Sequence, residues 1–406
     1  MSKFKYKIQN KKGELIEEIV EAEDKYVLAS ELRGGGNNVI FVEEVTKKHI
    51  FNMEKINQLL SRVKLQEKIT FARNLSAMIA AGLSVSRGMS VLERQTNNPK
   101  LKKVIKNLSE EVSKGNTLSG AMKKESKVFS SLFVSMVHAG EESGNLAESL
   151  NVISLQLEKS YSLRKKIKGA MMYPAIVLTA MIVIGVLMFV FVVPTLTATF
   201  ESLDTELPAT TKAIILLSDV LLEHYVIISL SVLLLISGLW SFITKTRKGK
   251  RYFHFFVLHI PLISKLVKEA NAARTARTLS SLLASGVDIM ESLSITQDVL
   301  QNVYYKDVLK KAEKNVQKGI ALSAVFAENE KIYPVLVGEM IAVGEETGKL
   351  SDMLLRIADF YEDEVDIATK NLSTIIEPFL MVVIGAGVGL FAVSMISPMY
   401  SLVDSI

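Results

Sequence analysis

The sequence contains no cysteine among its 406 residues. This absence excludes disulfide bonds, thiolate metal sites and cysteine nucleophiles. The five histidines show neither H-x-x-H nor H-x-x-x-H spacing, and no H-E-x-x-H motif occurs. The sequence also lacks G-x-S-x-G, G-x-G-x-x-G and a kinase signature. We therefore expect a protein that is not an enzyme and that holds neither a metal ion nor a cofactor.

Charged residues are missing from three long apolar runs. The chain as a whole is 49% hydrophobic with a mean hydropathy of +0.28, although 22% of its residues are charged. About 20 apolar residues span a bilayer core. We therefore predict an integral membrane protein with transmembrane helices at residues 171–196, 225–244 and 378–403. Buried core helices are the alternative, which the length of the runs and their lack of charge disfavour.

Lysine and arginine residues flank the first two spans on one side of the predicted membrane. The loop between these spans, residues 197–224, is acidic and carries a single lysine, Lys212. Because positive charge marks the cytoplasmic side, we expect a multi-pass protein of the cytoplasmic (inner) membrane with the N-terminus inside and the C-terminus outside. The N-terminus has no apolar stretch, so we expect no cleaved signal peptide. The basic residues are Arg164, Lys165, Lys166, Lys168, Lys245, Arg247, Lys248, Lys250 and Arg251.

An internal repeat links the two halves of the chain. ARNLSAMIAAGL at residues 72–83 resembles ARTLSSLLASGV at residues 276–287, an offset of 204 residues. The same offset, without gaps, pairs residues in both polar segments and in the spans that follow them, including Gly115 with Gly319, Gly140 with Gly344, Pro174 with Pro378, and Pro194 with Pro398. We therefore predict two tandem copies of a cytoplasmic domain, each followed by a membrane helix.

The predicted fold is mainly α. Apolar residues at Leu146, Leu150, Ile153 and Leu157 follow one helix face, and few prolines interrupt the segments, which indicates repeated antiparallel helix bundles. We expect the last helix of each copy to run straight into the membrane. The bundles are predicted at residues 51–170 and 275–377, after a small cytoplasmic N-terminal α+β domain at 1–50. The loop at 197–224 contains an amphipathic helix, and residues 245–274 form a cytoplasmic linker.

The stretch GEETGKLSDML, from Gly344 to Leu354, resembles a phosphate-binding loop only superficially. Its spacing is one residue short, and a leucine occupies the position of the required Ser or Thr. Its counterpart is GEESGNLAESL, at residues 140–150. We interpret both as turns between helices or as docking sites. The glycines supply backbone conformations that end one helix, and the acidic residues suit the start of the next. The residues concerned are Gly140, Glu141, Gly144, Gly344, Glu345 and Gly348.

The third span offers candidate contacts within the membrane. Glu377 precedes Pro378 at its edge, and an ionisable residue there is either functional or interfacial. Its counterpart, Tyr173, is an aromatic residue typical of the interface, which favours the interfacial interpretation. Further along the span, small residues would allow a second helix to approach closely. That helix belongs either to a partner or to the chain itself. The small residues are Gly385, Gly387 and Gly389.

Taken together, these motifs resemble the inner-membrane platform proteins of type IV pilus and type II secretion machines, the general secretion protein F family. The resemblance covers nearly the whole chain and also includes YPAIVLTAMI, LPATT, HIPLI, EPFLMVVIGAGVG and the opening FKYKIQNKKGELIEEIVEAED. The segment RGGGNNVIFVEEV departs from the family by lacking its Gly-hydrophobic-x-Val lead into the last strand of the opening domain.

The resemblance implies a platform that couples a cytoplasmic hexameric ATPase to the insertion or extraction of pilin or pseudopilin subunits. It also implies other inner-membrane assembly proteins as partners, self-association as a dimer or larger oligomer, and no nucleic acid. Two other classes stay open at this point, a membrane transporter and a membrane-anchored scaffold protein. A transporter is expected to carry buried charges beside matched helix breaks, which the spans do not show.

Overall fold

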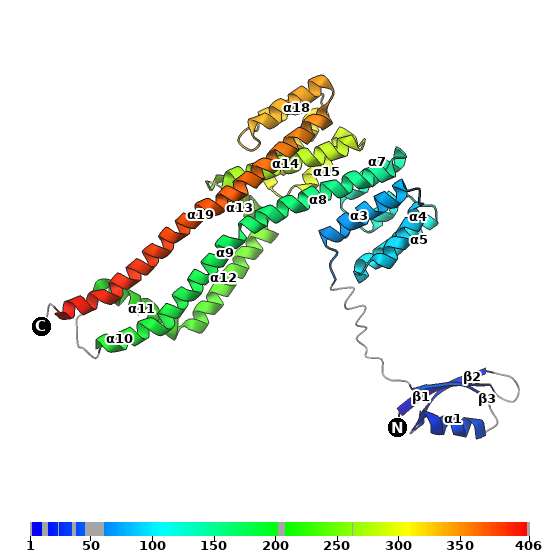
Figure 1. Ribbon diagram of the computed structural model, residues 1–406, viewed down its shortest axis with the longest axis horizontal. Coiled ribbons are helices and arrows are strands. Elements are labelled where there is room, and N and C mark those ends of the chain that lie inside the picture. Colours follow the sequence, from blue (N-terminus) through cyan, green and yellow to red (C-terminus); the bar gives the residue numbers. More distant parts are fainter. Residues whose placement is uncertain are drawn as a thin grey trace. The chain divides into compact units, whose positions relative to one another are not determined.

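The computed structural model describes residues 2–9, 15–22, 24–34, 38–44, 61–201, 208–261 and 263–403. It divides into two compact units (Figure 1). One comprises residues 1–62 together with 97–101, and the other comprises the rest of the chain. Each unit is described by itself below.

The N-terminal unit contains a three-stranded antiparallel sheet. Its strands are β1 (Ser2–Gln9), β2 (Leu15–Ala22) and β3 (Asn38–Glu44), in the order β2-β1-β3, and α1 (Lys25–Gly34) precedes β3. Alternate residues of β1 point to one face and are buried with Leu28 of α1, as period-2 patterning predicts. These residues are Phe4, Tyr6 and Ile8. The predicted strands and helix are thus present, while the turn between β1 and β2 lies outside the described residues.

The repeated segments form two sets of helices with the same order. The first set contains α3 (Leu65–Ala80), α4 (Val85–Gln95), α5 (Pro99–Ser113), α6 (Leu118–Lys124), α7 (Ser131–Glu142) and α8 (Leu146–Ala170). The second contains α14 (Ile263–Ala284), α15 (Ile289–Val299), α16 (Val303–Val316), α17 (Leu322–Ala327), α18 (Val335–Thr347) and α19 (Leu350–Val403). From α4 and α15 onward, each helix of the second set begins 204 residues after its counterpart. The repeat seen in the sequence is therefore a repeat of structure.

Glycines with left-handed backbone conformations end corresponding helices in both repeats. Gly82 and Gly286 follow α3 and α14 with φ values of 87° and 84°. Their N–H groups bond back to carbonyls in the last helical turn, as helix-ending glycines do. Both glycines, each of which interrupts an apolar run in the repeated sequence, therefore mark turns after their helices.

Aromatic residues fill corresponding parts of the two bundle cores. In repeat 1, the rings of Phe129 and Phe133 lie 5.0 Å apart, and Phe71 packs 5.6 Å from Phe129. In repeat 2, the position of Phe129 is taken by Tyr333, whose hydroxyl lies 2.9 Å from Thr275 Oγ1. Burial raises the pKa of Tyr333 because the phenolate is poorly solvated there. The hydroxyl therefore stays protonated as part of the core.

Three helical stretches in the described part of the chain are long and apolar enough to cross a membrane. The first joins α8 to α9 (Met172–Leu187), a π-helical turn η1 (Met188–Val192) and α10 (Val193–Glu201). The second is α12 (Tyr225–Lys245), which precedes α13 (Arg247–His259). The third is the distal part of α19, a single helix of 54 residues (Figure 1). In repeat 2 the last bundle helix thus continues unbroken into the apolar span, and in repeat 1 only one turn-like residue, Met171, separates α8 from α9.

Helix α11 (Ala209–Glu223) joins the first span to the third through two buried hydroxyls. In η1, Val193 donates its N–H to the carbonyl of Met188 five residues back, so the next carbonyl, Phe189, faces Pro194, which has no N–H. Ser218 of α11 donates its hydroxyl to that carbonyl at 2.7 Å.

The third span shows the same substitution of a hydroxyl for a missing N–H. In the α-helical register of α19, the carbonyl of Ser394 faces residue 398, which is again a proline. Thr211 of α11 donates its hydroxyl to this carbonyl. Thr211 and Ser218 are both buried. The one-residue difference between the two carbonyls reflects the extra residue in the π-helical turn.

Candidate functional site

The repeated acidic turns place one carboxylate in each bundle at the start of a short helix. Glu141, near the end of α7, accepts hydrogen bonds from the N–H of Leu118 at 2.5 Å, the N–H of Ser119 at 3.0 Å and the Ser119 hydroxyl at 2.5 Å. These donors belong to the first turn of α6, whose N–H groups have no partner within the helix. Glu141 therefore links the end of α7 to the start of α6 through hydrogen bonds.

Glu345 repeats this arrangement at the start of α17. It accepts from the N–H of Leu322 at 2.6 Å, the N–H of Ser323 at 3.1 Å and the Ser323 hydroxyl at 2.5 Å. The sequence predicts that the acidic residues serve the helix that follows them, and for Glu141 and Glu345 this prediction is wrong. They cap helices that begin 23 residues earlier. Both contacts share a serine at the second position of the capped helix, Ser119 in α6 and Ser323 in α17.

The glycines of the two turns have two different roles. Gly144 and Gly348 adopt left-handed conformations, with φ of 72° and 69°, as expected for residues that end a helix. Gly140 and Gly344 instead lie inside α7 and α18 and do not have positive φ. The conformational reason expected for these two is therefore wrong.

Close packing explains why Gly140 and Gly344 are glycines. A Cβ atom at Gly140 would lie 2.4 Å from the hydroxyl of Ser149 on α8. A Cβ atom at Gly344 would lie 2.9 Å from the Cα of Leu350 at the start of α19. Both distances are below van der Waals contact, so the absence of a side chain lets the last long helix of each repeat approach its predecessor.

The candidate contacts in the third span are open in this chain. Among the described residues, no atom comes within 4 Å of a Cβ placed on Gly385, Gly387 or Gly389. The chain's own spans therefore do not pack closely against these glycines. Glu377 and Pro378 are exposed where the apolar part of α19 begins. The structure thus places all five candidate residues on surface that a partner helix or lipid can reach.

Helix α8 of repeat 1 lies along α14 and α19 of repeat 2 (Figure 1). The contact contains a buried polar group in which Gln156 donates to Thr278 Oγ1 at 3.2 Å and accepts from the Ser281 hydroxyl at 3.1 Å. Toward the membrane spans, Leu163 joins an apolar cluster with Val365 and further residues. The two repeats therefore share a mixed polar and apolar interface that fixes α8 against repeat 2.

Ion pairs border this interface. Arg277 of α14 makes two hydrogen bonds to the carboxylate of Glu362, at 2.8 and 2.9 Å, and also bonds to Asp359. Lys159 of α8 lies 3.3 Å from Glu362. Further along, Lys166 lies 2.9 Å from Asp366. Basic residues of α8 therefore meet acidic residues of α19, which aligns the two helices in parallel.

Glu269 is a buried carboxylate at the same end of α14. Its Oε2 atom has no hydrogen-bond partner among the described residues, and its Oε1 lies 3.6 Å from the ammonium group of Lys265. Burial raises the pKa of Glu269 because the charged carboxylate is poorly solvated, and the nearby Lys265 opposes this effect only in part. This carboxylate is a source of pH-dependent stability within the repeat.

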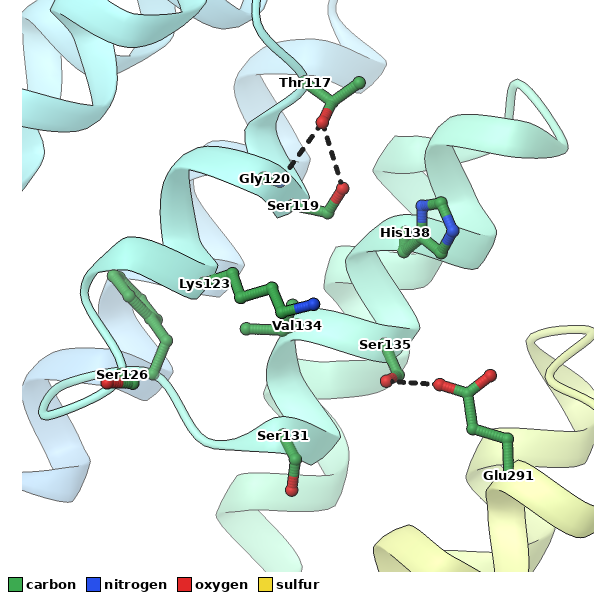
Figure 2. Close-up of a pocket in the computed structure, with 11 residues that line it drawn as sticks. Thr117, Ser119, Gly120, Lys123, Ser126, Ser131, Val134, Ser135, His138 and Glu291 are labelled. Atoms are coloured by element: carbon green, nitrogen blue, oxygen red, sulfur yellow. Dashed lines mark hydrogen bonds between the residues drawn. The ribbon is translucent and has the colours of Figure 1, made fainter.

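A polar hollow of about 480 Å³ lies between α6, α7 and α15. In Figure 2, Lys123 and His138 line it together with serine and threonine hydroxyls, and Ser135 donates a hydrogen bond of 2.8 Å to Glu291. The offset of 204 turns Lys123 into Ala327 and His138 into Ala342, so repeat 2 does not share this polar lining. The described residues contain no cluster of acidic and histidine side chains that could hold a metal ion. The hollow is suited to polar contacts and distinguishes one repeat from the other.

Comparison with known proteins matches both repeats to one family. The model of the family "Type II secretion system (T2SS), protein F" matches residues 71–194 and 275–398, which are separated by the same offset of 204. The type IV pilus assembly protein PilC of Thermus thermophilus is 34% identical over 409 residues, covering 100% of this chain and 99% of that protein.

Relatives from pilus and secretion systems are similarly close. The type IV pilus assembly protein PilC of Myxococcus xanthus is 32% identical and covers 100% of this chain and 96% of its own length. The type II secretion system protein F of Aeromonas hydrophila is 32% identical, covering 95% of this chain and 98% of its own length. With its two matched repeats and three apolar helical stretches, the chain is a multi-pass membrane protein that belongs to the type II secretion system protein F family.

Proposed function

We propose that this protein is the inner-membrane platform of a type IV pilus or type II secretion machine. In this role it couples a cytoplasmic hexameric ATPase to the insertion or extraction of pilin or pseudopilin subunits. Its relatives in Thermus thermophilus and Aeromonas hydrophila carry names from both kinds of machine, which supports the shared role and leaves the choice between them to experiment. The protein itself carries out no enzymatic reaction in this proposal.

The observation that carries the proposal is the continuity of α19. One helix of 54 residues begins at Leu350, just after the turn at Gly348 in repeat 2, and ends beyond the apolar span. A helix is stiff along its axis, so a displacement of the bundle moves the span with it. The bundles lie on the cytoplasmic side, where the ATPase acts, because basic residues flank the spans there. The C-terminus then lies on the outer side.

The exposed glycines of α19 support contact with a pilin helix. Gly385, Gly387 and Gly389 present open backbone on an apolar span, and small residues let two helices in a membrane approach closely. Other inner-membrane assembly proteins and a second copy of the chain complete the set of partners in this proposal. Nucleic acid is not among them.

The coupling role is tested by interrupting α19 between the bundle and the span. In a strain that lacks the chromosomal gene, we compare the full chain with a variant that carries a flexible Gly-Ser-Gly-Ser insertion after Asn371. The same insertion after Gly319, in an exposed turn of repeat 2, is the matched control. We expect the insertion after Asn371 to abolish filament assembly or secretion, although the protein accumulates in the membrane, and the control to retain activity. Normal assembly or secretion with the interrupted helix would refute the coupling role.

A further inference from the structure

In the contact between the repeats, a helix of repeat 1 covers a face of repeat 2, and the equivalent face of repeat 1 has no such cover among the described residues. Helix α8 covers a face of α14 and α19 formed by Arg277, Thr278, Ser281, Asp359 and Glu362. The side chains of Arg277 and Glu362 are only 10% and 14% exposed there. Because the two repeats have the same architecture, repeat 1 has a corresponding face on α3 and α8.

The corresponding face of repeat 1 is uncovered in the described structure. We call it the acceptor face, and it consists of Arg73, Asn74, Ala77, Leu155 and Glu158. Arg73 and Glu158 form the counterpart of the Arg277–Glu362 pair at 2.5 Å, but their side chains are 51% and 50% exposed. Leu155 is 50% exposed. The ion pair is conserved between the repeats, while its cover is missing in repeat 1.

Helix α19 carries the counterpart of the covering surface. The residues of α8 that contact repeat 2 correspond to Phe360, Asp363, Ile367 and Lys370, which we call the donor face. Phe360 is 47% exposed and Ile367 is 51% exposed, although both lie on the bundle side of the apolar span. Large apolar side chains exposed together on a helix in water mark an interaction surface.

We propose that the donor face of one copy docks onto the acceptor face of a second copy, which repeats between chains the contact that α8 makes within the chain. The inference gives a surface to the self-association that is part of the proposed function, but it rests on the geometry of the two repeats. No ATPase or pilin is needed for the contact.

The residues that change between the repeats change on both sides of the contact together. Within the chain, the polar Gln156 meets the polar Ser281. Between chains, the same geometry brings the apolar Phe360 against Asn74 and Ala77, the counterparts of Thr278 and Ser281. Burial of the exposed Phe360 ring against Ala77 gains free energy because water leaves both apolar groups.

Charge follows the same pattern. Within the chain, Lys159 lies 3.3 Å from Glu362 and 4.0 Å from Asp359. Its counterpart, Asp363, has the opposite sign and is brought beside Leu155 and Glu158, the counterparts of Asp359 and Glu362, where Arg73 is paired with Glu158. Arg277 binds two carboxylates, whereas Leu155 stands beside Arg73 in place of the second one, so Asp363 of the donor face supplies the carboxylate that Arg73 lacks.

The parallel course of α8 and α19 makes the contact compatible with one bilayer. The ion pairs Lys159–Glu362 and Lys166–Asp366 follow both helices in the same direction, toward the spans. A second copy in the same orientation can therefore repeat the contact. Because each copy has one donor and one acceptor face, the contact is heterologous, and repetition around an axis normal to the membrane closes a ring.

The absence of cysteine allows a direct test on the full-length chain. Membranes that contain the variant F360C/A77C are treated with a short bis-maleimide crosslinker. The variant Q156C/S281C is the positive control, since it carries the corresponding pair within one chain. The variant K310C/A77C is the negative control, because Lys310 is exposed on α16, away from both faces.

We expect F360C/A77C to form covalent dimers and larger species, and Q156C/S281C to form a crosslink within one chain. Mixed membranes in which one tagged copy carries only F360C and another only A77C are expected to crosslink between the two. The proposal is overturned if F360C/A77C crosslinks no more than K310C/A77C while the positive control reacts. It is also overturned if F360C alone crosslinks to itself, since that result shows a symmetric contact. Neither result bears on the ATPase or the pilin.

Discussion

The carboxylate that caps α17 is the most informative single group to remove. Glu345 accepts three hydrogen bonds, from two N–H groups and one hydroxyl at the start of that helix. A hydrogen bond to a charged group contributes about 1.5–3 kcal/mol, and the donors exposed by its loss recover part of this from water. We therefore expect Glu345→Ala to lower the free energy of unfolding by about 3 kcal/mol.

The neighbouring Glu346 provides a matched control. It is exposed and lies on the same helical turn, and among the described residues the hydrogen bonds to the start of α17 come from Glu345. Glu346→Ala removes the same charge and is expected to leave stability unchanged. In thermal unfolding of the detergent-purified full chain, followed by circular dichroism, Glu345→Ala should lower Tm by about 5–10 °C.

Repeat 1 supplies an independent replicate of the experiment. Glu141→Ala should reproduce the loss and Glu142→Ala should not, because only Glu141 caps α6. Equal Tm values for the variants of each adjacent pair would refute the assignment of these carboxylates as caps. Such a result would indicate that these carboxylates act only as acidic residues near a helix start, through the helix dipole.

Three further predictions concern packing, the spans and pH. Gly344→Ala should cost about 1–3 kcal/mol, because its Cβ meets the Cα of Leu350, and an unchanged Tm would contradict the packing argument. Thr211→Val leaves the carbonyl of Ser394 without its hydroxyl partner and should lower Tm by more than Thr211→Ser does; equal Tm values for the two variants would show that the hydroxyl is not needed. Burial raises the pKa of Glu269, so the folded chain keeps a proton that the unfolded chain has lost, and stability falls as pH rises from the unfolded pKa through the folded pKa. Glu269→Gln should therefore raise Tm near pH 8 and change it little near pH 4, and a gain at pH 4 instead would reverse the sign.

The sequence was sufficient to predict the architecture because its signals are local or strictly repeated. Apolar runs without charge identify spans by their length, and an ungapped offset of 204 residues identifies the two repeats. Gly82 and Gly286 were predictable as turns, since a glycine that interrupts an apolar helix pattern commonly takes a left-handed conformation. The strands of the N-terminal unit follow from their alternation of buried and exposed residues.

The contacts that define the site could not be read from the sequence in the same way. Glu141 reaches a helix that begins 23 residues before it, and no local pattern distinguishes that partner from the helix directly after it. Gly140 resembles Gly144 in the sequence, yet one is needed for space and the other for backbone conformation. These distinctions depend on how the helices pack, which a single sequence does not record.

The helix α11 illustrates the same limit. Its apolar and polar residues predict an amphipathic helix. The role of its Thr211 and Ser218 hydroxyls is visible only in the structure, where they donate to the carbonyls that Pro194 and its counterpart leave without an N–H donor. A matched pair of prolines in the spans was visible in the sequence. The groups that compensate for them were not, because Ser218 lies 29 residues from its acceptor and Thr211 lies 183 residues from its own.

The platform role is tested most directly by crosslinking the tagged full-length chain in living cells of its native host and identifying its partners by mass spectrometry. Our account predicts that a hexameric ATPase and a pilin-like protein are both recovered, with the pilin-like protein linked to α19 near Gly385, Gly387 and Gly389. The identity of that protein then assigns the machine to pilus assembly or to secretion. Recovery of neither partner, with crosslinks only to other copies of the chain or to unrelated proteins, would contradict the account and favour a transporter or a membrane-anchored scaffold.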